Sequence, residues 1–314
     1  MSSLSLIGLN YRNAPLKVRE KLAFDTERIE HFLRLLQQDM HLKEAVLLST
    51  CNRTELYVYC ESASCHADLL SALLHFCQVD PEQHSHYFYK KTSKAVIEHL
   101  FGVVSGLDSM VIGEDQILGQ IKNAYAIAVE EGMAKSYFHK LFHQAFRVGK
   151  RVRNETQINS GAASVASVAI ELSNKIFKTL KDKSILLVGA GDIAQVALMN
   201  LAKQGANRIT IINRTLQKAH DMARPFQAQV RPFSELYKAM QDADIVITST
   251  AAKQPIIKTE LTRDLMNRRK NRPLFLIDIA VPRDIEPNIR DLYNTFLYDI
   301  DDLEQVVAKT LDAR

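Results

Sequence analysis

The sequence has few cysteines, no apolar run as long as a membrane span and almost no excess of charge. Its four cysteines fall in the first quarter of a 314-residue chain, which does not fit the disulfide framework of a small secreted domain. The N-terminal apolar run is short and no basic segment precedes it, so we predict a strand there and not a signal peptide. These absences favour a reducing, cytoplasmic setting in which the thiols stay free.

The formal charge of +4 comes from 40 Lys and Arg against 36 Asp and Glu, which is too small to indicate nucleic-acid binding by itself. A metal site is also not expected. Cys60, Cys65 and His66 could form part of one, but no second pair of ligands follows at zinc-like spacing.

The length predicts two domains. Residues 1–145 mix expected strands (4–11, 45–51 and 55–60) with expected helices (25–40, 93–107 and 115–132) without a βαβ rhythm, which is typical of an α+β domain. Residues 146–160 are expected to form a helical linker. From 161 to 298 near-continuous apolar strands alternate with helices, which predicts a doubly wound, Rossmann-type α/β domain. Residues 299–314 are expected to begin a further helix.

One segment is strongly basic. Between Gly132 and Asn154 there is no Asp or Glu, and the segment carries six basic residues, Lys135, Lys140, Arg147, Lys150, Arg151 and Arg153. We expect one or two helices here, with Phe and Val on the inner face. The basic residues could be a solvated face that the helix dipole favours, or a track for phosphate groups.

The segment "VGAGDIA" (188–194) follows a strand and opens a helix, as the glycine fingerprint of dinucleotide sites requires. Gly189 would make the tight turn, Gly191 would let the backbone approach a pyrophosphate, and Ala194 would allow close helix–strand packing. The free N–H groups at the start of the helix would bind the phosphates. The expected cofactor-binding residues here are Gly189, Ala190, Gly191, Asp192, Ile193 and Ala194.

The end of the second strand of this domain indicates which cofactor binds. An NAD site would place Asp or Glu there to accept from the ribose 2′-hydroxyl, but this chain has Asn213, Arg214 and Thr215. Arg214 can clamp a 2′-phosphate, with Thr215 donating a hydroxyl and Lys218 close behind. The sequence therefore predicts NADPH.

A cysteine stands beside an arginine in "LSTCNRTELYVYC" (48–60), between two expected strands. Cys51 could be a small buried hydrophobe, or a nucleophile that attacks an acyl group of a negatively charged substrate. A nicotinamide domain in the same chain favours the second interpretation, because a thioester accepts hydride more readily than an ester or carboxylate.

At this point a family resemblance is evident. "STCNRTELY", "SGLDSMVIGEDQILGQIK" (105–122), "KRVRNET" (150–156), "LLVGAG" and "LIDIAVPRDIEP" (276–287) resemble glutamyl-tRNA reductase, the NADPH enzyme that opens tetrapyrrole synthesis from glutamate. The resemblance covers essentially the whole chain. It implies that Cys51 attacks the ester of glutamyl-tRNA(Glu), that tRNA leaves, and that NADPH reduces the thioester to glutamate-1-semialdehyde, the first step towards 5-aminolevulinate and porphyrins.

The resemblance also implies the site residues. The catalytic pair is Cys51 and His99. Without the resemblance, the simpler interpretation of His99 would be a histidine of the hydrophobic core. Arg53 can make a bidentate contact with the substrate's side-chain carboxylate, and Glu114 can pair with its ammonium group. Gln116 and Gln120 share a helix face. The implied substrate-binding residues are Thr50, Asn52, Arg53, Ser109, Glu114, Asp115, Gln116 and Gln120.

Two departures from the family pattern stand out. Asp115 replaces the usual proline of "GEPQ", and Asp is a competent helix-starting residue. The family continues past "LYDIDDL" into a connecting helix and a helical dimerisation domain, which we expect to be absent here, where the sequence ends at Arg314. The resemblance further implies a homodimer for the full-length protein and a handover to glutamate-1-semialdehyde aminomutase, with no DNA or membrane partner.

Two alternatives remain open at this level. The chain could be a catalytically impaired tRNA-binding or regulatory fragment of the same fold, although the intact Cys51, Gly189 and Gly191 argue against that. It could also be another NADPH-dependent oxidoreductase that acts on a small acid. Dependence on charged tRNA separates that enzyme from a glutamyl-tRNA reductase.

Overall fold

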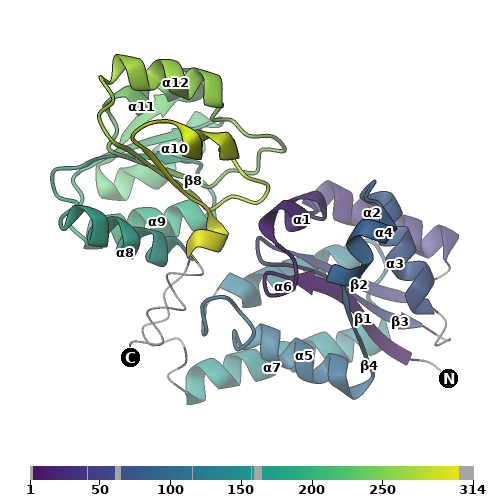
Figure 1. The fold of residues 1–314 in the computed structure, drawn as a ribbon. Coiled ribbons are helices and arrows are strands. Elements are labelled where there is room, and N and C mark those ends of the chain that lie inside the picture. Colours follow the sequence, from purple (N-terminus) through teal and green to yellow (C-terminus); the bar gives the residue numbers. More distant parts are fainter. Residues whose placement is uncertain are drawn as a thin grey trace. The chain divides into compact units, whose positions relative to one another are not determined.

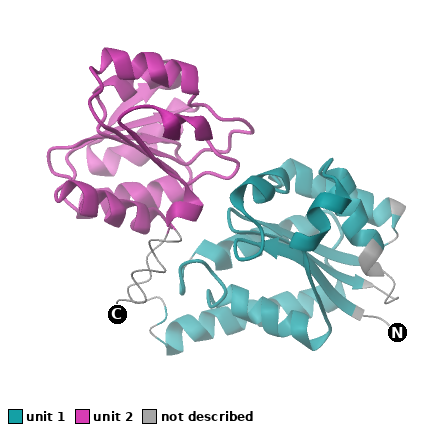
Figure 2. Ribbon diagram, in the orientation of Figure 1, with its two compact units in different colours: residues 1–162 teal, residues 163–314 magenta. Residues whose placement is uncertain are grey.

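The structure is a computed structural model that describes residues 3–40, 42–60, 65–114, 116–156, 158 and 165–303. The chain divides into two compact units, residues 1–162 and 163–314 (Figure 2). Each unit has a sheet and a hydrophobic core of its own.

The first unit is built on a four-stranded sheet of order β2-β3-β1-β4, in which every neighbouring pair is antiparallel. Strands β2 and β3 form a hairpin whose last pair is Ser49 and Thr54. The elements are β1 (Ser3–Asn10), α1 (Leu16–Lys21), α2 (Thr26–Asp39), β2 (Glu44–Ser49), β3 (Arg53–Cys60), α3 (Cys65–Phe76), α4 (Pro81–His84), β4 (Tyr89–Thr92), α5 (Lys94–Val104), α6 (Gln116–Glu130) and α7 (Ser136–Glu155).

Helices cover both faces of this sheet (Figure 1). On one side Phe32 of α2 packs against Phe76 of α3, with ring centroids 4.9 Å apart. On the other, Phe142 of α7 lies edge-on to Tyr57 of β3, with centroids 5.9 Å apart. Side chains two residues apart on a strand share a face, so Arg53, Glu55 and Tyr57 all point to the side that α5 and α7 cover.

The second unit is a six-stranded parallel sheet of order β10-β9-β8-β5-β6-β7, with α8 and α9 on one face and α11 and α12 on the other (Figure 1). The order reverses between β5 and β8, and the carboxyl ends of the strands at this point are where doubly wound sheets bind ligands. The elements are α8 (Val165–Phe177), β5 (Ser184–Val188), α9 (Asp192–Lys203), β6 (Arg208–Asn213), α10 (Leu216–Ala223), β7 (Gln229–Pro232), α11 (Leu236–Asp242), β8 (Ile245–Thr248), α12 (Thr259–Arg268), β9 (Leu274–Asp278) and β10 (Thr295–Tyr298).

The predicted fold class is confirmed: an α+β unit is followed by a Rossmann-type unit. The basic segment forms a single helix, α7. Residues 300–303 are helical, and residues 304–314, expected to continue that helix, lie outside the described residues. In the first unit the sequence analysis missed α1, α3, α4 and β4, and in the second it missed α8. Within the part of the chain that the structure describes, no helix is both long and apolar enough to cross a bilayer.

Candidate active site

Cys51 lies at the tip of the β2–β3 hairpin, and local hydrogen bonds fix the tip. Thr50 N donates to Arg53 O at 2.8 Å, and the Thr50 hydroxyl accepts from the backbone N–H groups of Asn52 and Arg53, each at 3.2 Å. Such Ser/Thr turns compete with strand pairing and end the hairpin here. The thiol is therefore held on a short turn between two buried strands.

An arginine of helix α1 also contacts the tip of the hairpin. Arg19 of α1 is 3% exposed, and its Nη1 donates to the Cys51 carbonyl oxygen at 2.5 Å. Burial, and then the charge of Glu114, raise the pKa of Cys51 to about 12, although Arg19 and Arg53 lower it in part. The group is accordingly a thiol at neutral pH and not a preformed thiolate.

Glu55 is the centre of a buried polar network behind the turn. It is fully buried, and its carboxylate accepts from Arg53 Nη1 at 2.6 Å, from the Tyr57 and Tyr89 hydroxyls at 2.5 Å each and from His99 Nε2 at 2.8 Å. Burial alone would raise the pKa of Glu55, but Arg53, His99 and Tyr57 hold it well below its usual range. Glu55 is therefore an ionised carboxylate with four donors around it.

This network fixes the two predicted residues Arg53 and His99. Arg53 Nη1 also lies 3.1 Å from Asp108 Oδ2, and its Nη2 donates to the Asp108 carbonyl oxygen. Because a carboxylate only accepts, His99 carries a proton on Nε2, and its Nδ1 lies 4.0 Å from Asp108 Oδ2. The guanidinium of Arg53 is thus already held by Glu55 and Asp108, and its contact with a substrate carboxylate stays a prediction.

Two implied substrate-binding residues contain buried polar atoms without a partner. Among the described residues, Asn52 Oδ1 and Gln116 Nε2 are buried and have no hydrogen-bond partner, whereas the buried Ser109 hydroxyl acts on the Glu114 carboxylate. Most buried polar atoms in proteins are hydrogen-bonded, so such atoms call for an explanation, and a polar ligand is one. Gln120 is half-buried one turn further along α6. Asp115 lies outside the described residues.

Glu114 places a carboxylate in the same region. It is 9% exposed, and burial raises its pKa, which Ser109, Arg53 and Arg153 offset in part. Its charge acts on Cys51, as the pKa of that thiol shows. An ammonium group near the thiol would find a carboxylate there.

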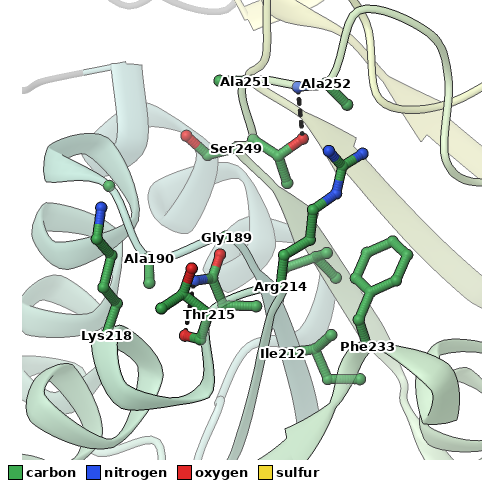
Figure 3. Close-up of a pocket in the computed structure, with 14 residues that line it drawn as sticks. Gly189, Ala190, Ile212, Arg214, Thr215, Lys218, Phe233, Ser249, Ala251 and Ala252 are labelled. Atoms are coloured by element: carbon green, nitrogen blue, oxygen red, sulfur yellow. Dashed lines mark hydrogen bonds between the residues drawn. The ribbon is translucent and has the colours of Figure 1, made fainter.

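The second unit contains a cavity of about 290 Å³ at the switch point of its sheet (Figure 3). Six of the predicted cofactor residues line it, namely Gly189, Ala190, Gly191, Asn213, Arg214 and Thr215. Asp192, Ile193 and Ala194 form the first turn of α9 beside it. At Gly189 φ is +116°, and an added Cβ would lie 2.1 Å from the Ser249 carbonyl oxygen, so only glycine fits this turn.

The lining of this cavity favours a phosphorylated ribose. No carboxylate is among the residues that line it, whereas Arg214 and Lys218 both are. The Arg214 guanidinium lies over the Phe233 ring, 5.8 Å from its centroid, and the two side chains extend side by side (Figure 3). The residues present therefore fit NADPH, with the fingerprint turn for the pyrophosphate and Arg214 for the 2′-phosphate.

Sequence reasoning missed several residues of these sites. Glu55, Tyr89 and Asp108 belong to the buried network, Arg19 holds the thiol's turn, and Phe233 with residues 249–252 lines the cofactor cavity. Glu55 carried a usable signal, because it is the one carboxylate in the strand that the sequence predicts over residues 55–60. No group of three or more His, Cys, Asp and Glu that could hold a metal occurs in the described ranges; the side chains of Cys60, Cys65 and His66 lie outside them.

Comparison with known proteins identifies the family. Residues 7–156 match the family "Glutamyl-tRNAGlu reductase, N-terminal domain", and residues 171–306 match "Shikimate / quinate 5-dehydrogenase". The chain is 40% identical over 309 residues to the glutamyl-tRNA reductase of Priestia megaterium, covering 98% of this chain and 69% of that protein. It belongs to the glutamyl-tRNA reductase family.

Other members of the family agree. The Bacillus subtilis glutamyl-tRNA reductase is 41% identical over 310 residues, which is 98% of this chain and 68% of that protein. The solved structure of the glutamyl-tRNA reductase from Methanopyrus kandleri is 31% identical and superposes with a TM-score of 0.51, over 99% of this chain and 74% of that one. This chain thus spans about two thirds of the length of its bacterial relatives.

Proposed function

We propose that this chain reduces the glutamyl group of glutamyl-tRNA(Glu) to glutamate-1-semialdehyde, with NADPH as hydride donor and Cys51 as nucleophile. This makes it an oxidoreductase of the first step of tetrapyrrole synthesis. The observation that carries the proposal is the turn at Cys51, where a free thiol lies next to Asn52, whose buried amide oxygen has no partner within the described residues, in a chain of this family.

The reaction consists of two steps. The Cys51 thiol loses its proton as sulfur bonds to the ester carbon, and the ester C–O bond breaks so that the tRNA ribose oxygen leaves and takes up a proton. Bound NADPH supplies the hydride that, with a proton, releases the aldehyde and restores the thiol. We assign the first step to residues 1–145 and NADPH binding to residues 161–298, so both compact units take part.

The geometry suggests roles for the remaining residues. Glu114 binds the substrate ammonium with Ser109 beside it, and Asn52 and Gln116 supply buried polar atoms that have no partner within the described residues. We also assign Thr50, Gln120 and Asp115 to substrate binding, as the family motifs imply. Arg53, held in place by Glu55 and Asp108, aligns the substrate's side-chain carboxylate.

His99 is suited to moving a proton. Glu55 holds its Nε2–H, which leaves Nδ1 as the nitrogen able to accept or return a proton. We assign to His99 the proton that the leaving ribose oxygen requires. Because Cys51 is protonated at neutral pH, the attack must be coupled to proton transfer, and a group of this kind is needed.

Partners and compartment follow from the same chemistry. A free catalytic thiol needs a reducing compartment, so we propose the cytoplasm. The aldehyde product is reactive, which favours handover to glutamate-1-semialdehyde aminomutase, and we propose a homodimer for the full-length protein.

A trapping experiment tests the proposal. The chain is mixed with radiolabelled glutamyl-tRNA without NADPH, and acid-stable label that hydroxylamine releases is measured on the protein. We expect label on the wild type and on Cys77→Ser, which alters the other described free cysteine, and none on Cys51→Ser. Adding NADPH, but not NADH, should convert the label to the semialdehyde.

Each alternative gives a different result. Absence of label on the wild type, with tRNA still bound, would indicate a catalytically impaired tRNA-binding protein. Label from free glutamate or another small acid, without tRNA, would indicate a different NADPH-dependent oxidoreductase.

A further inference from the structure

Helix α7 has an exposed basic face that the site described above does not use. Its exposed basic side chains include Lys140, His143, Arg147 and Lys150, which we call the α7 basic face. Residues three, four and seven apart share a side of a helix, so these four form one stripe. Within the described residues, no carboxylate pairs with Lys140, Arg147 or Lys150, whereas the neighbouring Arg151 pairs with Glu155 at 2.9 Å.

The core and one anchor fix the direction in which this face points. Phe138, Leu141, Phe142 and Ala145 are buried, so the helix cannot rotate to hide its basic side. The helix begins against Glu44, whose carboxylate accepts from the backbone N–H groups of Lys135 and Phe138 at 2.9 and 2.8 Å. Glu44 is also the first residue of β2, the strand that ends just before Cys51.

The other end of α7 lies next to the candidate active site. Arg153 Nη1 donates to the Val104 carbonyl at 2.8 Å, and its Nη2 to the Glu114 carbonyl at 3.3 Å. At Gly149 an added Cβ would lie only 2.9 Å from the Val104 carbonyl oxygen, so α7 and α5 are in close contact there. The basic face therefore runs along the sheet towards the end where Cys51 and Glu114 lie.

Until Cys51 attacks, the glutamyl ester is still attached to an RNA, whose phosphates continue beyond the turn that holds the thiol. We propose that the α7 basic face binds the phosphodiester backbone of that RNA. Unpaired Lys and Arg side chains on one helix face match the charge of an RNA backbone, and such contacts position the RNA without reading its bases. This inference rests on the proposed function and adds the surface that carries the tRNA.

The test measures tRNA binding by the 314-residue chain as a function of salt. Arg147→Gln/Lys150→Gln removes two charges and keeps side chains that favour helix. Each phosphate contact contributes about 0.7–0.9 to the slope of log affinity against log salt, so we expect the slope to fall by roughly 1.4–1.8. Lys90→Gln/Lys94→Gln is the matched control, because these exposed lysines lie on β4 and at the start of α5, outside the α7 basic face. It should leave the slope unchanged.

A second measurement separates this inference from the proposed function. Acylation of Cys51 by an activated α-glutamyl ester without RNA should proceed at the wild-type rate in Arg147→Gln/Lys150→Gln. An unchanged salt slope in that variant, or an equal fall in the Lys90/Lys94 control, would overturn the inference while thioester formation by the wild type still supports the reductase. A reduced slope in a chain that forms no thioester would support the RNA contact and refute the reductase chemistry.

Discussion

At the scale of single residues, the environment of Cys51 differs from that of most reactive cysteines. Activated thiols usually have a lowered pKa, whereas burial and Glu114 raise the pKa of Cys51 to about 12. Arg19 and Arg53 are close but do not compensate for burial. A protonated thiol resists oxidation and off-target alkylation until a substrate changes its surroundings.

We therefore predict slow alkylation of Cys51 by iodoacetamide. At pH 8 the rate should be on the order of a thousandfold below that of an exposed cysteine, and it should keep rising up to pH 10 without a plateau. Glu114→Gln removes a like charge, which lowers the pKa of Cys51, so that variant should react faster at pH 8. Mass spectrometry of the Cys51 peptide measures the rate. A plateau below pH 9 in the wild type would contradict the prediction.

At the scale of elements, the pairing of three strands places the Glu55 network. Gly8 of β1 lies opposite Glu55 on β3 and opposite Tyr89 on β4. A Cβ at Gly8 would lie 2.8 Å from Glu55 Cγ and 3.2 Å from Tyr89 Cε2. Because Gly8 has no side chain, Glu55 and Tyr89 have room to form their hydrogen bond across β1.

Gly8→Ala should displace Glu55 and loosen its hold on Arg53 and His99. Overpacking of a core of this kind costs about 1–3 kcal/mol, so we expect that loss in the free energy of unfolding together with slower thioester formation. Urea unfolding and the trapping assay measure the two effects. Gly102→Ala in α5 is the control, because nothing lies within 4 Å of its added Cβ. Equal stability and activity of the two variants would refute the role given to Gly8.

Two buried carboxylates join the loops after β8 and β9 next to the cofactor cavity. Asp278 accepts from Thr248 Oγ1 at 3.0 Å and from Ile285 N at 2.9 Å, and Asp284 accepts from Thr250 N at 2.8 Å. Burial, and then the charge of Asp284, raises the pKa of Asp278 to about 8. Burial also raises the pKa of Asp284, which Thr250 and Arg214 offset in part.

This pair predicts a pH dependence of stability. Between the ordinary pKa of Asp, about 4, and its folded value, about 8, the folded chain binds the proton of Asp278 and the unfolded chain does not. The contribution of Asp278 to stability should therefore fall as pH rises from about 4 to about 8 and level off above it. Asp284→Asn keeps the contact with Thr250 and removes the repulsion, so its decline should be smaller. Urea unfolding of both proteins from pH 5 to 9 tests this, and parallel curves would refute it.

At the scale of the whole molecule, the proposed reaction divides between the two compact units. The thiol and its network belong to the first unit, and the cofactor cavity belongs to the second. Because each unit has its own core, their stabilities need not be linked.

We predict two transitions in calorimetric unfolding. NADPH at a hundred times its Kd should raise the free energy of unfolding of the second unit by about 2.7 kcal/mol. The transition temperature of the first unit should stay unchanged. Arg214→Gln should reduce the shift produced by NADPH and spare any shift produced by NADH, because only NADPH carries the 2′-phosphate. Equal shifts of both transitions would show that the units unfold together.

The sequence alone was enough to predict the fold class and the cofactor, and it singled out Cys51 as the candidate nucleophile. Apolar runs, glycine spacing and the missing acid after β6 are local features that constrain the backbone nearby, and the family motifs are local as well. The sequence also located most of the residues around the thiol, because they are close to it in the chain or lie in one further motif.

Only the tertiary structure decided how those residues are held. Glu55 meets Tyr89 and His99 because β4 and α5 pack beside β3, and Arg19 reaches Cys51 from α1, 32 residues away. Burial also decided the protonation of Cys51, since the pKa of a thiol depends on what surrounds it and not on its neighbours in the chain. The contacts of Glu55 and Arg19 join distant parts of the chain, so they cannot be predicted from periodicity or motif spacing.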